Sequence, residues 1–503
     1  MPDFLTSNSS TAPGLATLAA RVGAGQRSGL RTGLRNKLAL LLAAGALGAC
    51  SLNPALVRPE APVAAVYPAE TGGPIMANLG WREFFSDPRL QALIAAALEN
   101  NRDLRTAALR IEEARALYNI QTADLLPNLN LGATGNSQRT PANLSTTGGA
   151  YVSRSYQVGL SLASFELDFF GRVRSLNQAA LATYLATDEA RQAAQLSLVA
   201  QVANAYLNER AYAEQLTLAQ RTLEGRETGL KLAKQRFDVG AFSALDLRQN
   251  EILVQTARVS VVQLGRQRAQ AENALTLLVG QPLTNLPQGQ TLSAQNVSTT
   301  IPAGLPSDLI TRRPDIRAAE QRLESANANI GAARAAFFPR ISLTAGYGTA
   351  SPTLSGLFDS GSNAWSFAPT ITLPIFDAGR NKANLDVSQV RKELAVVDYE
   401  KTIQTAFREV ADALVARGLI DDEIEAQEAV RVANADRVRL ADLRYQNGIT
   451  STLELLDAQR DLFSAEQALV QARLLRLTNA IDLYRSLGGG LTETSVPLAA
   501  TTR

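Results

Sequence analysis

Apolar side chains recur every third or fourth residue along two long stretches of this chain, which is the spacing of an amphipathic helix. The residues with this spacing are Leu196, Val199, Val202 and Tyr206 in the first stretch and Ile403, Phe407, Val410 and Leu414 in the second. No proline occurs from residue 172 to 281 or from 375 to 496. The pattern therefore predicts four long helices, at residues 172–237, 243–279, 380–445 and 451–487.

Shorter stretches alternate apolar side chains with polar or small ones, and a period of two is typical of β-strands. These stretches lie at residues 129–133, 155–169, 341–347 and 365–376. Within 155–169 the apolar positions change parity between Leu162 and Phe165. That change predicts a β-bulge, or the level at which a strand leaves a membrane.

The second half of the chain repeats the first. Asp103-Leu104-Arg105 matches Asp315-Ile316-Arg317 at an offset of 212 residues, and Gly171-Arg172 matches Gly379-Arg380 at an offset of 208. Each half opens with a shorter predicted helix, at 103–125 or 315–338, which a proline ends. We therefore predict a duplicated unit, with the first repeat at 81–300, the second at 301–490 and a flexible tail at 491–503.

Helix lengths predict how the elements stack. A 66-residue helix is about 99 Å long, and helices of 37 and 23 residues placed end to end span about 90 Å. The short helices of each repeat can therefore lie end to end beside a long one. The predicted fold is mainly α, built from long coiled helices in an α-barrel, with a small part of four β-strands per chain.

Four strands raise the question of what pairs with the outer two. In a soluble protein they could form an antiparallel sheet against the helices. In lipid, each open edge would leave backbone groups unpaired at several kcal/mol apiece, and the smallest membrane barrels have about eight strands. A membrane protein of this kind must pool strands between copies, and two, three or four copies would give eight, twelve or sixteen.

Composition removes most catalytic chemistry. The chain has no histidine and one cysteine, Cys50. These counts exclude Ser-His-Asp triads, HExxH zinc sites, intrachain disulfides and multi-cysteine metal sites. The 49 Lys and Arg residues nearly balance the 47 Asp and Glu residues, so the chain lacks the basic excess of a nucleic-acid-binding protein. We expect no enzyme activity, no metal and no nucleic-acid partner.

The N-terminal region has the order of a targeting signal. Basic residues between 31 and 37 precede an apolar run at 38–47, which is too short to span a membrane. Leu47-Gly48-Ala49-Cys50 then resembles a bacterial lipobox, which implies removal of residues 1–49 and attachment of diacylglycerol and an acyl chain to Cys50. Ser51 favours export to the outer membrane. The alternative is an ordinary signal peptide with a chance cysteine. Residues 50–80, rich in Pro and Ala, predict an extended tether.

Four segments together resemble the TolC-like outer-membrane efflux protein family, in its NodT-type lipoprotein branch. They are 81–90 (WREFFSDPRL), 313–322 (RPDIRAAEQR), 326–339 (ANANIGAARAAFFP), and 444–448 (RYQNG) followed by 455–459 (LLDAQ). The resemblance implies a homotrimer, with a twelve-stranded barrel in the outer-membrane lipids above a periplasmic helical tunnel. It also implies two partners: a periplasmic adaptor, or membrane fusion, protein and an inner-membrane pump of the resistance–nodulation–division (RND) class.

A conduit of this kind needs a gate. We expect the gate at the helix turns that lie farthest from the strands. Glu454 and Asp457 are three residues apart and share a helix face. The resemblance implies that they ring the periplasmic entrance, where three copies would place six carboxylates that favour cations. It also implies a latch between Tyr445 and Asp246. The sequence departs from the family pattern at Thr450, where some members have an arginine, so that part of the latch is absent or replaced. The alternative for the two carboxylates is a solvated helix face.

The same turns are candidates for contact with the adaptor. Arg236 and Gly240 lie at the first turn, and Arg444 and Gly448 lie at the second. Left-handed turn geometry alone also accounts for the two glycines. Ser243 and Ser451 each precede a predicted helix and can cap it.

The leading hypothesis is an outer-membrane channel that passively conducts drugs, other toxic compounds or metals in a multidrug efflux system. Two alternatives stay open. One is the exit duct of type I protein secretion, driven by an ATP-binding-cassette exporter. The other is a lipid-anchored periplasmic coiled-coil spacer that conducts nothing.

Overall fold

The computed structural model describes residues 51–64, 67, 79–146, 148–295, 297, 310 and 312–494. Residues from Leu52 onward form one compact unit. Across these ranges, no helix combines the length and apolar character needed to cross a membrane.

Two sets of helices follow one another along the chain. The first set is α2 (Trp81–Phe84), α3 (Pro88–Asn100), α4 (Arg102–Ala123), α5 (Arg172–Asp238) and α6 (Ala244–Val279), with 3-10 turns η2 (Ala142–Leu144) and η3 (Leu292–Ala294). The second set is α8 (Pro314–Ala335), α9 (Arg380–Gln446) and α10 (Thr452–Ser486). Each of the four predicted long helices is present, with ends within one residue of the prediction. Helix α3 was not predicted.

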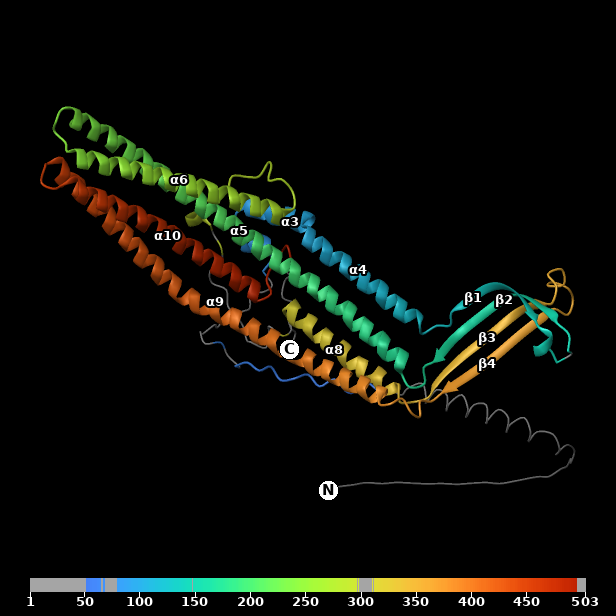
Figure 1. Cartoon of the computed structure of the whole chain (residues 1–503). Helices are drawn as coiled ribbons and strands as arrows, with labels where there is room; N and C mark the ends of the chain where they lie inside the picture. Colours follow the sequence, from blue (N-terminus) through green and yellow to red (C-terminus); the bar gives the residue numbers. More distant parts are fainter. Residues whose placement is uncertain are drawn as a thin grey trace, which may run out of the picture. The chain divides into compact units, whose positions relative to one another are not determined.

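The long helices pack side by side in an order that repeats between the halves. Helix α5 lies along α4 and α6, and α9 lies along α8 and α10 (Figure 1). The two halves join where α5 packs against α8, and α10 also contacts α5. The shorter helices therefore run beside the long ones, as their lengths predicted.

Local chemistry explains where the helices begin. Asn101 caps α4, since its side chain accepts a hydrogen bond from the backbone N–H of Leu104 at 2.8 Å. Proline occupies the first position of α3 and α8, where its missing N–H costs nothing. Gly171 and Gly379 precede α5 and α9 with φ of 75° and 84°, a left-handed conformation that suits glycine.

The strands form one antiparallel sheet in the order β1-β2-β3-β4. Their bounds are β1 (Leu129–Thr140), β2 (Tyr151–Leu167), β3 (Arg340–Ser351) and β4 (Asn363–Thr372). The register between β2 and β3 shifts between Leu162 and Phe165, and Ser164 in that interval has a φ of 48°. The predicted parity change is therefore a β-bulge.

The outer edges of β1 and β4 pair with no strand in the described chain. Large apolar side chains on the outer strands face outward uncovered: Leu129, Leu131, Trp365, Phe367 and Ile371. A sheet with open edges and such a surface is incomplete as a soluble element.

The core lies midway along the helices, where α2 and α3 pack against α5 and α10. Phe84 stacks on Tyr484 with ring centroids 3.9 Å apart, and Phe85 meets the same ring edge-on. Both phenylalanines are almost fully buried. Helix α2 is therefore part of the core that joins the two halves.

Candidate functional site

The turns that join α5 to α6 and α9 to α10 have the same backbone geometry. Gly240 and Gly448 have φ of 71° and 70°. In the first turn the N–H of Ala241 donates to the carbonyl of Arg236, and in the second that of Ile449 donates to the carbonyl of Arg444, both at 2.9 Å. Open space surrounds the Cα of both glycines, so conformation rather than packing requires them there.

A side-chain contact ties these two turns together. The guanidinium of Arg236, in the last turn of α5, donates to the hydroxyl of Tyr445, in the last turn of α9, at 3.1 Å. The same guanidinium lies over the Tyr445 ring, 5.6 Å from its centroid. Both residues are half-buried. This contact, called here the tip tie, joins the hairpin of the first half to the hairpin of the second.

Glu454 and Asp457 lie in the first two turns of α10, and each is engaged by an arginine. The Arg444 guanidinium lies 3.3 Å from Glu454, and the Arg460 guanidinium lies 3.1 Å from Asp457. These side chains are all more than a third exposed, so the pairs are weak and can rearrange. The two carboxylates share a helix face and remain accessible to mobile ions.

Asp246 stands apart from Tyr445 in this conformation. Its carboxylate accepts from the hydroxyl of Ser243 at 2.6 Å, and its backbone N–H donates back to that hydroxyl. Ser243 therefore caps α6 as predicted. Ser451 makes no such side-chain bond at the start of α10, so that prediction was wrong. Here the partner of Tyr445 is Arg236, which the sequence had marked only as a docking residue.

The tip thus brings together five of the predicted residues in two groups. One is the tip tie, and the other is the Arg444–Glu454 pair with Asp457 one turn further along α10. Thr450, at the second turn, has a buried hydroxyl oxygen that meets no hydrogen-bond partner in the described chain. These contacts are polar, shallow and reversible, which suits a gate rather than a catalytic centre.

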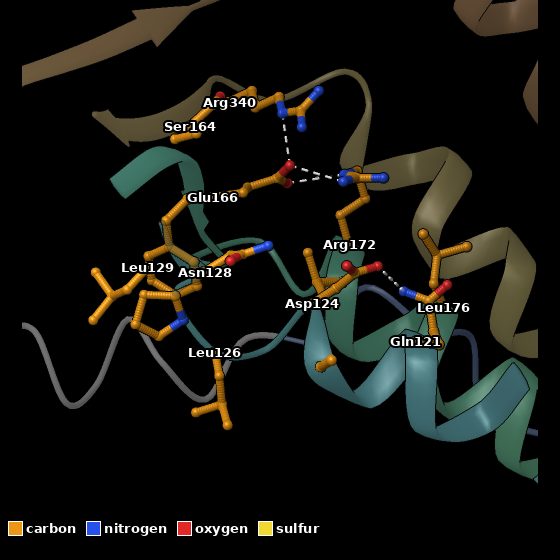
Figure 2. Close-up of a pocket in the computed structure, with 15 residues that line it drawn as sticks. Gln121, Asp124, Leu126, Asn128, Leu129, Ser164, Glu166, Arg172, Leu176 and Arg340 are labelled. Carbon is orange, nitrogen blue, oxygen red and sulfur yellow. Dashed lines mark hydrogen bonds and ion pairs between the residues drawn. The ribbon is translucent and has the colours of Figure 1, made fainter. Parts of the chain in front are cut away.

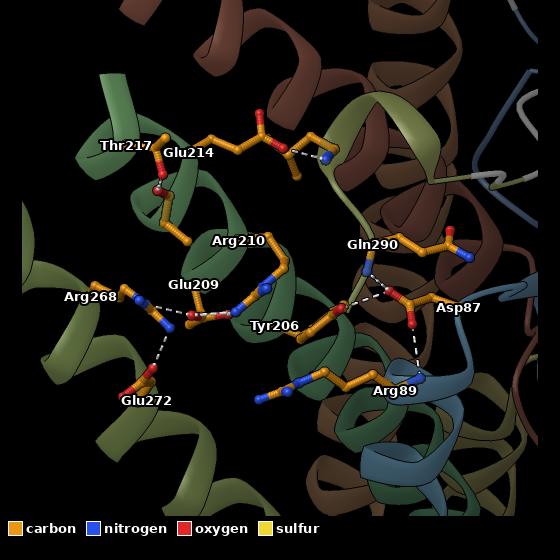
Figure 3. A network of polar contacts seen from close by, with 12 residues as sticks. Asp87, Arg89, Tyr206, Glu209, Arg210, Glu214, Thr217, Arg268, Glu272 and Gln290 are labelled. Atoms are coloured by element: carbon orange, nitrogen blue, oxygen red, sulfur yellow. Dashed lines mark hydrogen bonds and ion pairs between the residues drawn. The ribbon is translucent and has the colours of Figure 1, made fainter. Parts of the chain in front are cut away.

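A buried polar network sits at the level of the core (Figure 3). The carboxylate of Asp87 is fully buried and accepts from the Tyr206 hydroxyl and the Gln295 amide, both at 2.6 Å, and from the backbone of Arg89 and Gln290. Burial pushes the pKa of Asp87 up, but the four hydrogen bonds outweigh it and hold the pKa below its ordinary value. The network pins the segment after α6 to α3 and α5.

Where the sheet meets the helices, a cavity of about 640 Å³ is open to the surface (Figure 2). Three of the charged residues that line it pair with one another. Glu166 of β2 accepts two hydrogen bonds of 2.8 Å from Arg172 of α5, and Arg340 of β3 lies 2.6 Å from the same carboxylate. This three-residue clamp fixes the angle between strands and helices. Asp124, which also lines the cavity, accepts a hydrogen bond from the Gln121 amide at 2.9 Å.

Among the described residues, no cluster of His, Cys, Asp and Glu could hold a metal ion. Cys50, the predicted lipid acceptor, lies outside the described residues, as do most of the residues predicted to form the flexible tail.

Comparison with known proteins covers almost the whole chain. The profile of the outer membrane efflux protein family matches residues 93–281 and 305–489. A probable efflux pump outer membrane protein, TtgC of Pseudomonas putida, is 48% identical over 467 residues, which are 91% of this chain and 96% of the relative. Outer membrane protein OprJ of Pseudomonas aeruginosa is 49% identical over 461 residues, 90% of this chain and 95% of that protein.

Solved structures share the fold as well as the sequence. The open state of the MtrE outer membrane channel of Neisseria gonorrhoeae aligns with a TM-score of 0.82 at 46% identity, over 89% of this chain and all of that one. A membrane protein from Pseudomonas aeruginosa aligns with a TM-score of 0.83 at 48% identity, over 87% of this chain and all of its own.

Proposed function

This chain belongs to the outer membrane efflux protein family, and from that membership we propose how its parts conduct small molecules. It is the outer membrane channel component of an efflux pump. Two observations support this assignment. Both halves match the family, and the mainly helical fold with four strands matches a known outer membrane channel. The resemblance stated from sequence is thereby confirmed.

We propose that several copies of the chain together complete the wall of the channel. The reason is that the internal duplication predicts a second set of contacts between the halves, which a single chain does not make. Within a chain, α5 of the first half packs on α8 of the second, and β2 pairs with β3. The equivalent contacts of α9 and β4 are with α4 and β1, which one chain cannot make with itself. They require the next copy.

The surfaces left free have the apolar character that such contacts need. Helix α4 has no buried residue, and Leu117 on it is 58% exposed. Helix α9 carries an uncovered stripe at helical spacing, in which Leu394 is 60% exposed. The residues on these two surfaces are Leu109, Leu117 and Ile120 on α4 and Val387, Val390, Leu394 and Val397 on α9. We propose three copies on the family resemblance, which gives twelve strands and three tip ties around one axis.

The role needs no catalytic residue and no cofactor apart from lipid. We propose that the protein is not an enzyme, and that Cys50 carries the diacylglycerol and acyl chain that anchor it in the outer membrane. The tip, with Glu454 and Asp457 near the opening, acts as the periplasmic gate and favours cations. The exposed turns around Gly240 and Gly448 contact the periplasmic adaptor.

We infer the class of substrate from the relatives, and the inner-membrane pump selects the individual compound. Relatives in Pseudomonas putida are described as antibiotic and toluene efflux pump outer membrane proteins. We propose small organic compounds, including drugs and solvents, delivered by an adaptor and an inner-membrane RND pump. The alternative is protein secretion driven by an ATP-binding-cassette exporter, and no contact among the described residues favours it.

Crosslinking in intact cell envelopes tests the partners directly. The protein is purified after crosslinking, and the attached inner-membrane protein is identified by mass spectrometry. An RND pump with its adaptor is the expected result. An ATP-binding-cassette exporter in its place would overturn the efflux assignment while leaving the channel architecture intact.

A further inference from the structure

The first described residues lie against the helices in an extended conformation. Residues 52–58, called here the strap, bind side chains of α8. At one end the carbonyl of Leu52 accepts from the Arg334 guanidinium at 3.3 Å, and at the other the Arg58 guanidinium lies 2.6 Å from Glu320. These α8 residues are about 21 Å apart along the helix, which matches the roughly 20 Å reach of six extended residues.

The middle of the strap is held by both halves of the protein. Asn53 donates to the Gln178 side chain of α5 at 2.8 Å and accepts from the Ser175 hydroxyl of α5 at 2.7 Å. The buried amide of Asn327, on α8, donates to the carbonyl of Pro54 at 2.8 Å. The strap therefore bridges the α5–α8 contact that joins the two halves.

A glycine on α8 makes room for this bridge. A methyl group on Gly331 would overlap the amide oxygen of Asn53 and would come within 2.9 Å of the Ser175 hydroxyl. Gly331 lies inside a helix, where glycine is about 1 kcal/mol less favourable than alanine. Its φ is ordinary, so the turn geometry that explains Gly240 does not apply. Close approach of the strap explains it.

We infer that the α5–α8 groove around Gly331 is a docking seat for the strap, and that the seat fixes the lipid anchor at the level where helices meet the sheet. Arg334 lies in the last turn of α8, six residues before β3 begins. Leu52 follows Cys50 by two residues in the sequence. The inference rests on the proposed acylation of Cys50. A docked strap turns a loose tether into a fixed attachment, so the lipid and the strands enter the membrane at one level.

The test measures strap mobility in the mature, membrane-extracted protein. Val57 is 76% exposed, so Val57→Cys carries a nitroxide label without filling the seat. The electron paramagnetic resonance line shape should show an immobilised label. Gly331→Ala and, separately, Asn53→Ala should each lower the ratio of docked to free strap about tenfold, because each disrupts two hydrogen bonds of Asn53.

Matched variants separate docking from general damage. Gly225→Ala is the control, because Gly225 is an exposed glycine inside α5 with nothing near its Cα; it should leave the spectrum unchanged. Asn53→Ala leaves α8 untouched, so it tests the seat even where Gly331→Ala impairs folding. A mobile label in the parent protein, or an immobile one in both seat variants, would overturn the inference.

The same samples report on the anchor independently. Protein with native Val57 should take up no label, since a Cys50 whose sulfur carries diacylglycerol offers no free thiol. Labelling of that protein would refute acylation, whereas strap mobility with Cys50 blocked would refute only the docking seat.

Discussion

The tip tie makes the most direct prediction about gating. Tyr445→Phe removes the hydroxyl that accepts from Arg236 at 3.1 Å but keeps the ring under the guanidinium. A hydrogen bond of this kind in a half-buried position contributes about 1 kcal/mol, a factor of about five in the open-to-closed ratio. Three ties that release together would shift that ratio about a hundredfold. Arg236→Ala also removes the cation–π contact, about 0.5–1 kcal/mol more per copy.

Single-channel recording in planar bilayers measures this shift as the fraction of time open. Tyr445→Phe should raise it, and Arg236→Ala should raise it further. Arg248→Ala is the matched control, because Arg248 pairs with Glu251 on its own helix and ties nothing across the tip. Open fractions that stay equal in all three variants would show that the contact between α5 and α9 does not hold the tip closed.

Further predictions concern the gate charges, the anchor and the core. Glu454→Gln with Asp457→Asn should reduce cation preference and weaken block by multivalent cations in bilayers; unchanged reversal potentials would remove both residues from the pore. Cys50→Ser should give a loosely held form on membrane fractionation, and firmly retained channels would show that the strands suffice. Asp87→Asn should lower stability by about 2 kcal/mol, because a buried acceptor is lost. The folded pKa of Asp87 lies below its ordinary value of 3.8, so its contribution is present above that value and is lost as pH falls through the folded pKa. The melting temperatures of Asp87→Asn and the parent should therefore converge in acid, and a constant difference would contradict this.

Periodicity predicted the long helices well, because their sequences contain no proline and the apolar stripe is continuous. The bulge in β2 was also readable, since a change of parity has few other causes. Helix α3 was not predicted, although Pro88 occupies its first position and Asp87 caps it by accepting from the N–H of Arg89 at 2.8 Å. Ser451 shows the converse, a capping residue type that makes no cap.

From the sequence, the candidate residues could be assigned to the two turns, but their side-chain contacts could not. Glu454 and Asp457 share a helix face by spacing alone, and the turn glycines follow from local geometry. The pairing of Tyr445 with Arg236 depends on how two hairpins about 200 residues apart lie against each other, which no local pattern encodes. The docking of the strap was hidden for the same reason. Residues 52–58 looked like a linker because their hydrogen-bond and ion-pair partners lie on α5 and α8, far along the chain.

The central claim is that copies of this chain form a conducting channel. The most direct test is the conductance of the purified, detergent-resistant assembly in a planar lipid bilayer. We expect discrete, cation-favouring conductance steps from an assembly of three copies. A correctly folded, lipidated protein that produces no steps, with the tip tie intact or removed, would contradict it and leave a non-conducting spacer.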